Sequence, residues 1–164
     1  MPGFTLTDLI EFRRCLGRFA TGVTVITCSD ESGAHYGITA NSFSSVSLEP
    51  PLVLWNIAKV SRSLDAFLAA EYFGINVLRA DQEAVSSNFA RSDANLFDGI
   101  DSGLDDHGIP KLDESLAWFA CRTFDVHECG DHHIIIGEVL DFEARQGSPL
   151  LFYRGRYQRL PGDR

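Results

Sequence analysis

A run of small hydroxyl residues lies in an otherwise extended stretch of this chain. Ser42, Ser44, Ser45 and Ser47 stand where a core strand would carry Val or Ile, so we expect their side chains to contact polar groups. Glu49-Pro50-Pro51 follows directly. Because proline has no backbone N–H, the double proline separates two extended segments and turns the chain at a fixed point.

A second polar cluster follows the apolar run 52–55. Hydroxyls and two cations alternate in it: Asn56, Lys59, Ser61, Arg62 and Ser63. This combination suits a phosphate group, which takes hydroxyl or backbone N–H donors and a fixed positive charge. The alternative is a pair of turns in which the serine side chains hydrogen-bond to the backbone and the two cations face solvent. The residues alone leave both interpretations open.

A third cluster combines a thiol, a carboxylate and two imidazoles in Cys129-Gly130-Asp131-His132-His133. A zinc site would recruit Cys129, His132 and His133, but adjacent histidines on a strand point to opposite faces, so we predict no metal site. A cysteine nucleophile with a histidine base has no supporting local signature. A polar hairpin tip in which His132 bonds its own turn remains the structural alternative.

The composition indicates one globular domain spanning residues 1–164. Of the 164 residues, 45% are hydrophobic and 12 are Phe, which is enough to build a core without disulfides. The net charge of −9 argues against binding to nucleic acid and to anionic membranes. No apolar run of about 18 residues and no leader pattern is visible, which predicts a cytoplasmic protein.

The four cysteines form no C-x-x-C pair, and we expect reduced, buried thiols at Cys15, Cys28, Cys121 and Cys129. The glycines form no G-x-G-x-x-G, and there is no G-K-[ST]. A Rossmann dinucleotide site and a P-loop are therefore excluded at the motif level.

Helical periodicity is confined to three short segments. Thr5 or Thr7 can cap a first helix in which Leu9, Phe12, Leu16 and Phe19 recur at helical spacing. Residues 64–70 predict a second helix, capped by Ser61 or Ser63, whose N-terminus would favour a bound phosphate. Residues 82–90 predict a third, capped by Asp81.

Strand patterns dominate the rest of the chain. We expect strands at 23–28, 34–43, 72–78, 116–128, 134–144 and 150–154. With the extended segment 52–55 after the double proline they make about seven, mostly in hairpins. A mainly β fold, an antiparallel β-barrel with a few short helices, accounts for this order. The acidic stretch 91–114 reads as a long loop, for which a solvated face, calcium binding and partner docking are the alternatives.

Several segments together carry a resemblance to a known family. They are 16–27, 39–43, 45–53, 59–63, 104–112, Gly130-Asp131-His132 and 149–155. In these segments the chain resembles the short-chain flavin reductases, the NAD(P)H-dependent reductase components of two-component flavin monooxygenases. The similarity covers nearly the whole sequence in the expected order.

The resemblance implies an FMN-binding split barrel that forms a homodimer with flavin near the subunit interface. It implies FMN, with FAD possible, as the flavin and NADH or NADPH as the hydride donor. The cofactor-binding residues that it implies are Thr39, Ala40, Asn41, Ser42, Ser45, Val46, Asn56, Ile57, Ala58, Lys59, Ser61, Ser63, Asn88, Phe89, Ala90, His132, Tyr153 and Arg154. Members of the family often carry a cation where Asn88 stands, so the phosphate charge is expected on Lys59 and Arg62.

The hypothesis that follows is an NAD(P)H:flavin oxidoreductase that supplies reduced flavin to a partner monooxygenase. His132 is its expected catalytic residue, which positions the nicotinamide so that hydride passes from its C4 to flavin N5. Three other classes remain as alternatives: a flavin-dependent oxidase or reductase of another small molecule, a non-enzymatic FMN- or haem-binding module, and a metal hydrolase.

Overall fold

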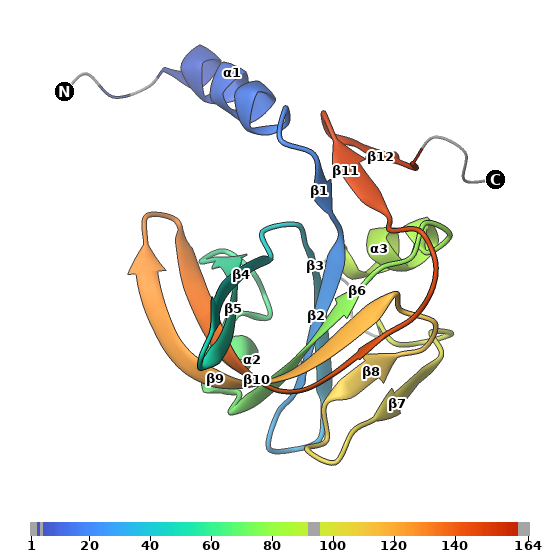
Figure 1. The fold of residues 1–164 in the computed structure, drawn as a ribbon. Helices are drawn as coiled ribbons and strands as arrows, with labels where there is room; N and C mark the ends of the chain where they lie inside the picture. The colour runs from blue at the N-terminus through green and yellow to red at the C-terminus, as the bar shows by residue number, and fades with distance from the viewer. Residues whose placement is uncertain (1–2, 4, 92–95, 161–164) are drawn as a thin grey trace.

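The structure is a computed structural model that describes residue 3 and residues 5–91 and 96–160. Its elements are α1 (Leu6–Leu16), β1 (Thr21–Gly22), β2 (Thr24–Ser29), β3 (His35–Ala40), β4 (Ser44–Leu48), β5 (Pro51–Ala58), α2 (Leu64–Ala69), β6 (Tyr72–Val77), α3 (Glu83–Phe89), β7 (Ser102–Leu104), β8 (Pro110–Leu112), β9 (Ala117–Cys129), β10 (His132–Ala144), β11 (Leu151–Tyr153) and β12 (Arg156–Gln158). Figure 1 shows their arrangement.

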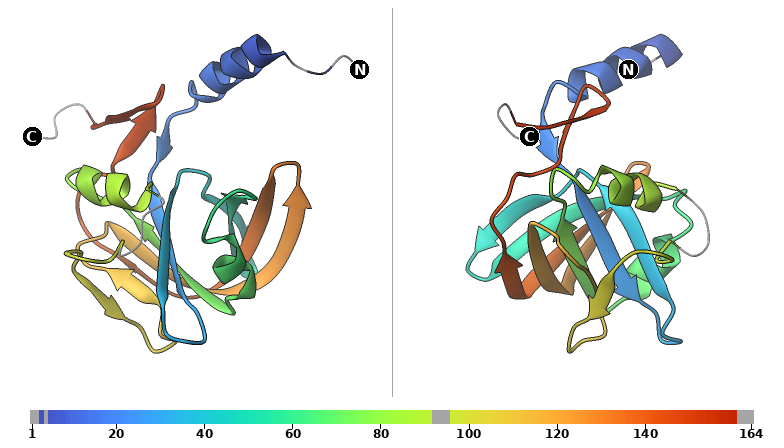
Figure 2. Two further views of the ribbon diagram at one scale, coloured as in Figure 1. Left: turned by 180° about the vertical axis from the view of Figure 1, so that it is seen from behind. Right: turned by 90° about the vertical axis from the view of Figure 1, so that its right-hand side faces the viewer.

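Seven strands form one curled antiparallel sheet in the order β3-β2-β6-β9-β10-β5-β4. Figures 1 and 2 show this sheet curling on itself, with β3 and β4 as its two edges. Short strands lie outside it, β1 with β11 and β12, and β7 with β8. Of these, the sequence pattern predicted β11, at 150–154, and missed the others. The predicted mainly β, antiparallel split-barrel class is confirmed.

Strand β5 shows how the core positions the outer face. Val53, Trp55 and Ile57 are buried, and the residues between them are half-buried. Because side chains alternate along a strand, this pattern turns Asn56 and Ala58 away from the core. Trp55 anchors the strand through an edge-on contact with Phe67 of α2, with ring centroids 4.9 Å apart.

The helix caps differ in part from the prediction. Thr5 caps α1 as expected, in a reciprocal capping box with Asp8. The expected side-chain caps of the other two helices are wrong, because neither Ser63 before α2 nor Asp81 near α3 bonds a helix N–H. Asp81 instead binds Arg79, with its two oxygens 2.7 and 2.8 Å from guanidinium nitrogens. A charged partner close by outcompetes the cap.

The acidic stretch is more ordered than its composition predicted. Strands β7 and β8 form a hairpin within it, and Asp105 accepts backbone bonds from His107 at 3.0 Å and Ile109 at 2.7 Å. Within the described part of the chain, no group of three or more His, Cys, Asp or Glu side chains is placed to hold a metal ion. The acidic side chains of this stretch therefore organise a turn and a surface.

Helix α1 stands away from the sheet in every view (Figures 1 and 2). None of its residues is buried, and Leu6, Leu16 and Phe19 beyond its end are 76%, 58% and 78% exposed. An apolar helix face left in solvent marks a contact surface. No helix in the described residues has the length and apolar character needed to cross a bilayer.

Gly137 allows β10 to pass close to the core, and a side chain there should destabilise the fold. A Cβ at this position would lie 2.5 Å from Phe73 Cζ and 2.9 Å from Cys121 Cβ. We expect Gly137→Ala to lower the free energy of unfolding by about 1–3 kcal/mol, measured by urea denaturation. Gly103→Ala, on an exposed strand with nothing within 4 Å of the added Cβ, is the control. Equal midpoints for both variants would contradict the predicted clash.

Candidate functional site

Two adjoining hollows lie between α1, β5 and the tip of the β9–β10 hairpin. The larger, of about 810 Å³, is lined by residues that include Arg13, Phe19 and Thr21. The smaller, of about 470 Å³, is lined by residues that include Ala58, Cys129 and His132. Both hollows share Asn41, Ser42 and Asn56, so they form one continuous depression.

A backbone edge is exposed where the two hollows meet. Strand β4 pairs with β5 only as far as Leu54, whereas β10 continues along the other edge to Ala58. Beyond Leu54 the open edge is met by the side chain of Ser42, whose Oγ accepts a hydrogen bond of 2.9 Å from the Asn56 N–H. Backbone groups of a strand bond alternately to each side. The Ala58 N–H is therefore directed into the depression, where it can serve a ligand.

Two buried polar atoms in the depression have no protein partner. They are Asn56 Oδ1 and Thr21 Oγ1. A buried polar group without a hydrogen bond costs stability, so such atoms are a reason to expect a ligand. An amide oxygen accepts from an N–H or O–H, and a flavin offers both on its ring and its ribityl chain. The free hydrogen-bonding groups of the depression thus fit a flat polar ring with a hydroxylated tail.

His132 lies at the mouth of the smaller hollow, at the first position of β10. Its Nδ1 is 2.7 Å from Asp131 Oδ1, and the imidazole holds the pKa of this carboxyl below its usual range. A carboxylate on Nδ1 fixes the ring orientation and leaves Nε2 for a ligand. The adjacent His133 has a buried Nδ1 without a partner, as expected for a side chain on the opposite face.

Comparison with known proteins identifies the family to which the chain belongs. A model of the flavin reductase-like domain matches residues 16–161. The chain belongs to the flavin reductase family. It is similar to the FMN reductase (NADH) SmoA of Agrobacterium fabrum, 48% identical over 92% of this chain and 85% of that protein.

Two further relatives have the same architecture or role. The reductase subunit HsaB of a flavin-dependent monooxygenase from Rhodococcus jostii is 42% identical over 96% of this chain and 80% of its own. The Streptomyces globisporus NADH:FAD oxidoreductase SgcE6, solved with NAD and FAD fragments, superposes with a TM-score of 0.91 at 35% identity over 99% of both chains. The chain spans about half the length of other reductases, 50% of one from Rhizobium meliloti and 47% of one from Acinetobacter baylyi.

The structure brings one part of the predicted flavin site together. The predicted residues that line the depression are Thr39, Ala40, Asn41, Ser42, Asn56, Ala58 and His132. They come from the end of β3, the turn after it, β5 and the hairpin tip. Ser45 and Val46 lie on β4, exposed and outside these two hollows.

Two predicted flavin contacts cannot be made by side chains. Ile57 and Phe89 are each 1% exposed and belong to two different core clusters. Phe89 packs against Phe97, with centroids 5.0 Å apart, which leaves only its backbone for a ligand. Neighbouring Asn88 uses its amide to bind the carbonyl of Leu96. The α3 turn therefore presents less polar surface than the sequence indicated.

The predicted phosphate residues are also engaged within the protein. The Lys59 ammonium forms an ion pair with Glu128 on β9, and this pair holds the pKa of the Glu128 carboxyl below its usual range. Ser61 Oγ accepts from the Ser63 N–H at 3.3 Å. A phosphate at this position would have to compete with Glu128 for Lys59.

Sequence reasoning missed the contribution of the N-terminal segment. Arg13, Cys15, Gly17 and Thr21 line the larger hollow together with Phe152. The periodicity of this segment predicts a helix and by itself indicates no ligand site. The available signal was the set of arginines on that helix in a chain of net charge −9.

Thiol reactivity should divide the cysteines into two classes. The expectation that all four are buried is wrong, because Cys15 and Cys129 are exposed. Burial raises the pKa of Cys28 and of Cys121 to about 12 each, and the thiolate is the reactive form. We expect iodoacetamide at mild alkaline pH to label Cys129 in the native protein and Cys28 and Cys121 only after denaturation, as read by peptide mass spectrometry. Native labelling of Cys121 would contradict this core assignment.

Proposed function

We propose that this protein is the NAD(P)H-dependent reductase of a two-component flavin monooxygenase system. It transfers hydride from a reduced nicotinamide nucleotide to FMN, or to FAD, and supplies the reduced flavin to a partner oxygenase. The observation that carries the proposal is the depression beside β5, where a partnerless amide oxygen of Asn56 and the oriented imidazole of His132 face one ligand space. The names and structures of the relatives support the same chemistry.

The residues of the depression bind and orient two flat rings. Asn56 Oδ1 and the Ala58 N–H offer an acceptor and a donor to the flavin ring, and Ser42 keeps the β5 edge in place through Asn56. Thr39 Oγ1 donates to the carbonyl of Ser86 at 2.6 Å, which ties β3 to α3 behind the site. A bound flavin supplies the hydride acceptor. The protein supplies alignment, since hydride transfer needs no general base.

His132 is proposed to position the nicotinamide over the flavin ring. Asp131 holds its Nδ1 at 2.7 Å, so Nε2 can donate or accept at the open side of the depression. Lys59, Ser61 and Ser63 are proposed contacts of the flavin tail on the α2 side, with Lys59 exchanging its ion pair with Glu128 for one with the phosphate.

The protein is proposed to act as a homodimer, in the cytoplasm and as one flavin reductase-like domain. Support for the dimer comes from α1, whose Leu9, Ile10 and Leu16 are 45%, 47% and 58% exposed. A second copy that covered this face would also close one side of the larger hollow, which residues of α1 line. We expect light scattering to report a dimer for the native chain and a monomer for Leu9→Glu/Leu16→Glu. Glu11→Gln on the polar face should stay dimeric, and a monomeric native chain would refute the dimer.

Flavin binding and bleaching test the reductase proposal. We expect added FMN or FAD to bind the purified protein and anaerobic NADH or NADPH to bleach its visible absorbance. Saturating FMN should also slow the alkylation of Cys129, which lines the smaller hollow. An oxidase of another small molecule or a non-enzymatic flavin module would bind flavin without rapid bleaching. Failure to bind FMN and FAD would end the proposal.

A further inference from the structure

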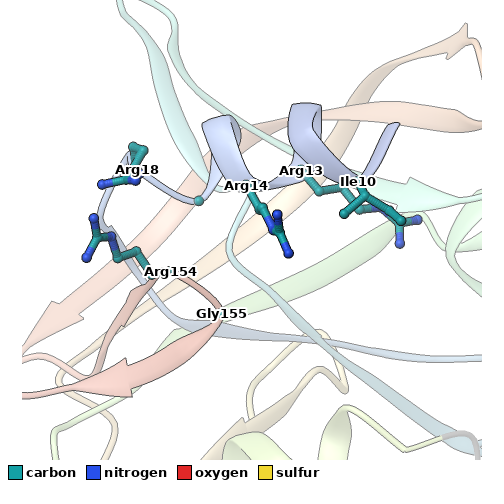
Figure 3. A pocket seen from close by; sticks show the side chains of 7 residues that line it. Ile10, Arg13, Arg14, Arg18, Arg154 and Gly155 are labelled. Atoms are coloured by element: carbon teal, nitrogen blue, oxygen red, sulfur yellow. The ribbon is translucent and has the colours of Figure 1, made fainter. Parts of the chain in front are cut away.

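Four arginines surround a hollow of about 470 Å³ between α1 and the β11–β12 turn. Arg13, Arg14 and Arg18 come from α1 and the residues after it, and Arg154 comes from the turn. Figure 3 shows Arg18 and Arg154 with their guanidinium groups at the same end of the hollow, and Arg14 extending from α1 toward the turn at Gly155. The chain has a net charge of −9, so a local concentration of four arginines, the arginine cluster, is unusual in it. Such a concentration favours the binding of a negatively charged ligand.

Three of the four arginines in the cluster form no ion pair within the described residues. Beyond the effect of His132, the charge of Arg13 helps to lower the pKa of Asp131, and Arg154 lies 5.4 Å from the centroid of the Tyr153 ring. Arg14 forms an ion pair with Glu11. Within the described residues, no carboxylate lies within 4.0 Å of a charged nitrogen of Arg13, Arg18 or Arg154. Cations that share one hollow repel one another. A bound anion removes this repulsion and takes the paired N–H donors that guanidinium groups present.

The backbone holds the two sides of the arginine cluster together. The Arg154 N–H donates to the carbonyl of Gly17 at 2.9 Å, which fixes the turn against the end of α1. Arg154 and Gly155 have φ angles of 53° and 76°, the conformation of a two-residue hairpin turn that normally carries Asn-Gly. An arginine in this left-handed conformation costs energy that asparagine or glycine avoids, which is consistent with a role for its side chain.

The arginine cluster is continuous with the depression already described. Arg13, Gly17 and Gly155 line both its hollow and the larger one that contains Asn56. By contrast, Lys59 at the far side is paired with Glu128. A ligand whose ring lies beside β5 can therefore extend past α1 and reach unpaired cations.

We infer that the arginine cluster binds the diphosphate of a dinucleotide whose ring half lies in the depression beside β5. This dinucleotide is NADH if the flavin tail lies at Lys59 as proposed above, and it is FAD if the flavin tail runs past α1 instead. The inference rests on the proposed function and goes beyond it by assigning Arg13, Arg14 and Arg18 to nucleotide recognition. It also predicts that these arginines strengthen the binding of dinucleotides but not of mononucleotides, because a mononucleotide such as FMN lacks the second phosphate.

Calorimetric titration of the full chain with ADP and with adenosine tests the site directly. We expect ADP to bind at least about tenfold more tightly than adenosine, and Arg14→Gln/Arg18→Gln to abolish this difference. Arg122→Gln is the matched control, since Arg122 is paired with Glu138 at 2.6 Å on β9 and β10, outside the hollow. Competition then identifies the source of the diphosphate. If it is that of NADH, ADP inhibits flavin reduction competitively with NADH. If it is that of FAD, ADP displaces FAD but not FMN in a fluorescence titration.

Three results would overturn the inference. They are ADP binding no tighter than adenosine, ADP binding unchanged in Arg14→Gln/Arg18→Gln, and ADP competing with neither dinucleotide. Anaerobic bleaching by NADH on the same native sample separates this failure from that of the proposed function. Bleaching together with arginine-independent ADP binding refutes the diphosphate site alone. Absence of bleaching together with arginine-dependent ADP binding refutes the reductase and leaves an anion site without its dinucleotide assignment.

Discussion

Replacing His132 with alanine is expected to slow the reduction of bound FMN by NADH by about ten- to a hundredfold, while FMN affinity changes less than about twofold. The imidazole stands at the mouth of the smaller hollow, held by Asp131 at 2.7 Å. Its loss removes a contact that aligns the nicotinamide but none of the β5 groups that face the flavin. Stopped-flow absorbance under anaerobic conditions measures the rate, and a fluorescence titration measures the affinity.

Two neighbours of His132 provide controls for this experiment. His133→Ala removes an imidazole on the opposite face of β10, whose Nδ1 is buried, and should leave the reduction rate close to that of the native protein. Asp131→Ala frees His132 without removing it and should give an intermediate loss of rate. Normal reduction by the His132→Ala protein would remove His132 from the mechanism and leave it as a polar hairpin tip.

Replacing Asn56 with leucine is expected to weaken FMN binding by about ten- to a hundredfold without lowering the stability of the free protein. Asn56 Oδ1 is buried and has no partner, so the ligand-free fold bears its desolvation cost. Leucine has a similar size and no polar atom, and the bond from the Asn56 N–H to Ser42 belongs to the backbone. Fluorescence titration gives the affinity, and thermal unfolding without flavin gives the stability.

Asn76 is the matched control because its side-chain oxygen is also buried but is hydrogen-bonded. Its side-chain amide donates to the carbonyl of Val25 at 3.1 Å, and its Oδ1 accepts from the Leu112 N–H at 2.8 Å. Asn76→Leu should therefore lower the free energy of unfolding by about 1–3 kcal/mol. If Asn56→Leu lowers stability as much as Asn76→Leu and leaves FMN affinity unchanged, Asn56 is a structural residue and the flavin lies elsewhere.

Much of the scaffold follows from local sequence. The alternation along 51–58 sets which side chains of β5 enter the core, the Thr5–Asp8 capping box starts α1, and the Gly130-Asp131 turn joins the two longest strands. These features depend on residues a few positions apart, so the chain specifies them before any tertiary contact forms. The predictable part of the site lies at or near the ends of these locally specified strands and turns. It comprises residues 39–42, Asn56 and His132.

Long-range contacts decided the remainder of the site. Lys59 is compensated by Glu128, 69 residues away, and Phe89 is buried by packing against Gly37 and Phe97. The arginine cluster exists because the Arg154 turn bonds the end of α1, which begins the chain. A residue type states which charge or surface is available, but whether that charge is neutralised or that surface buried depends on which distant segment the fold places against it. The sequence therefore determined the scaffold and the chemistry on offer, and the tertiary structure decided which groups remain free to bind a ligand.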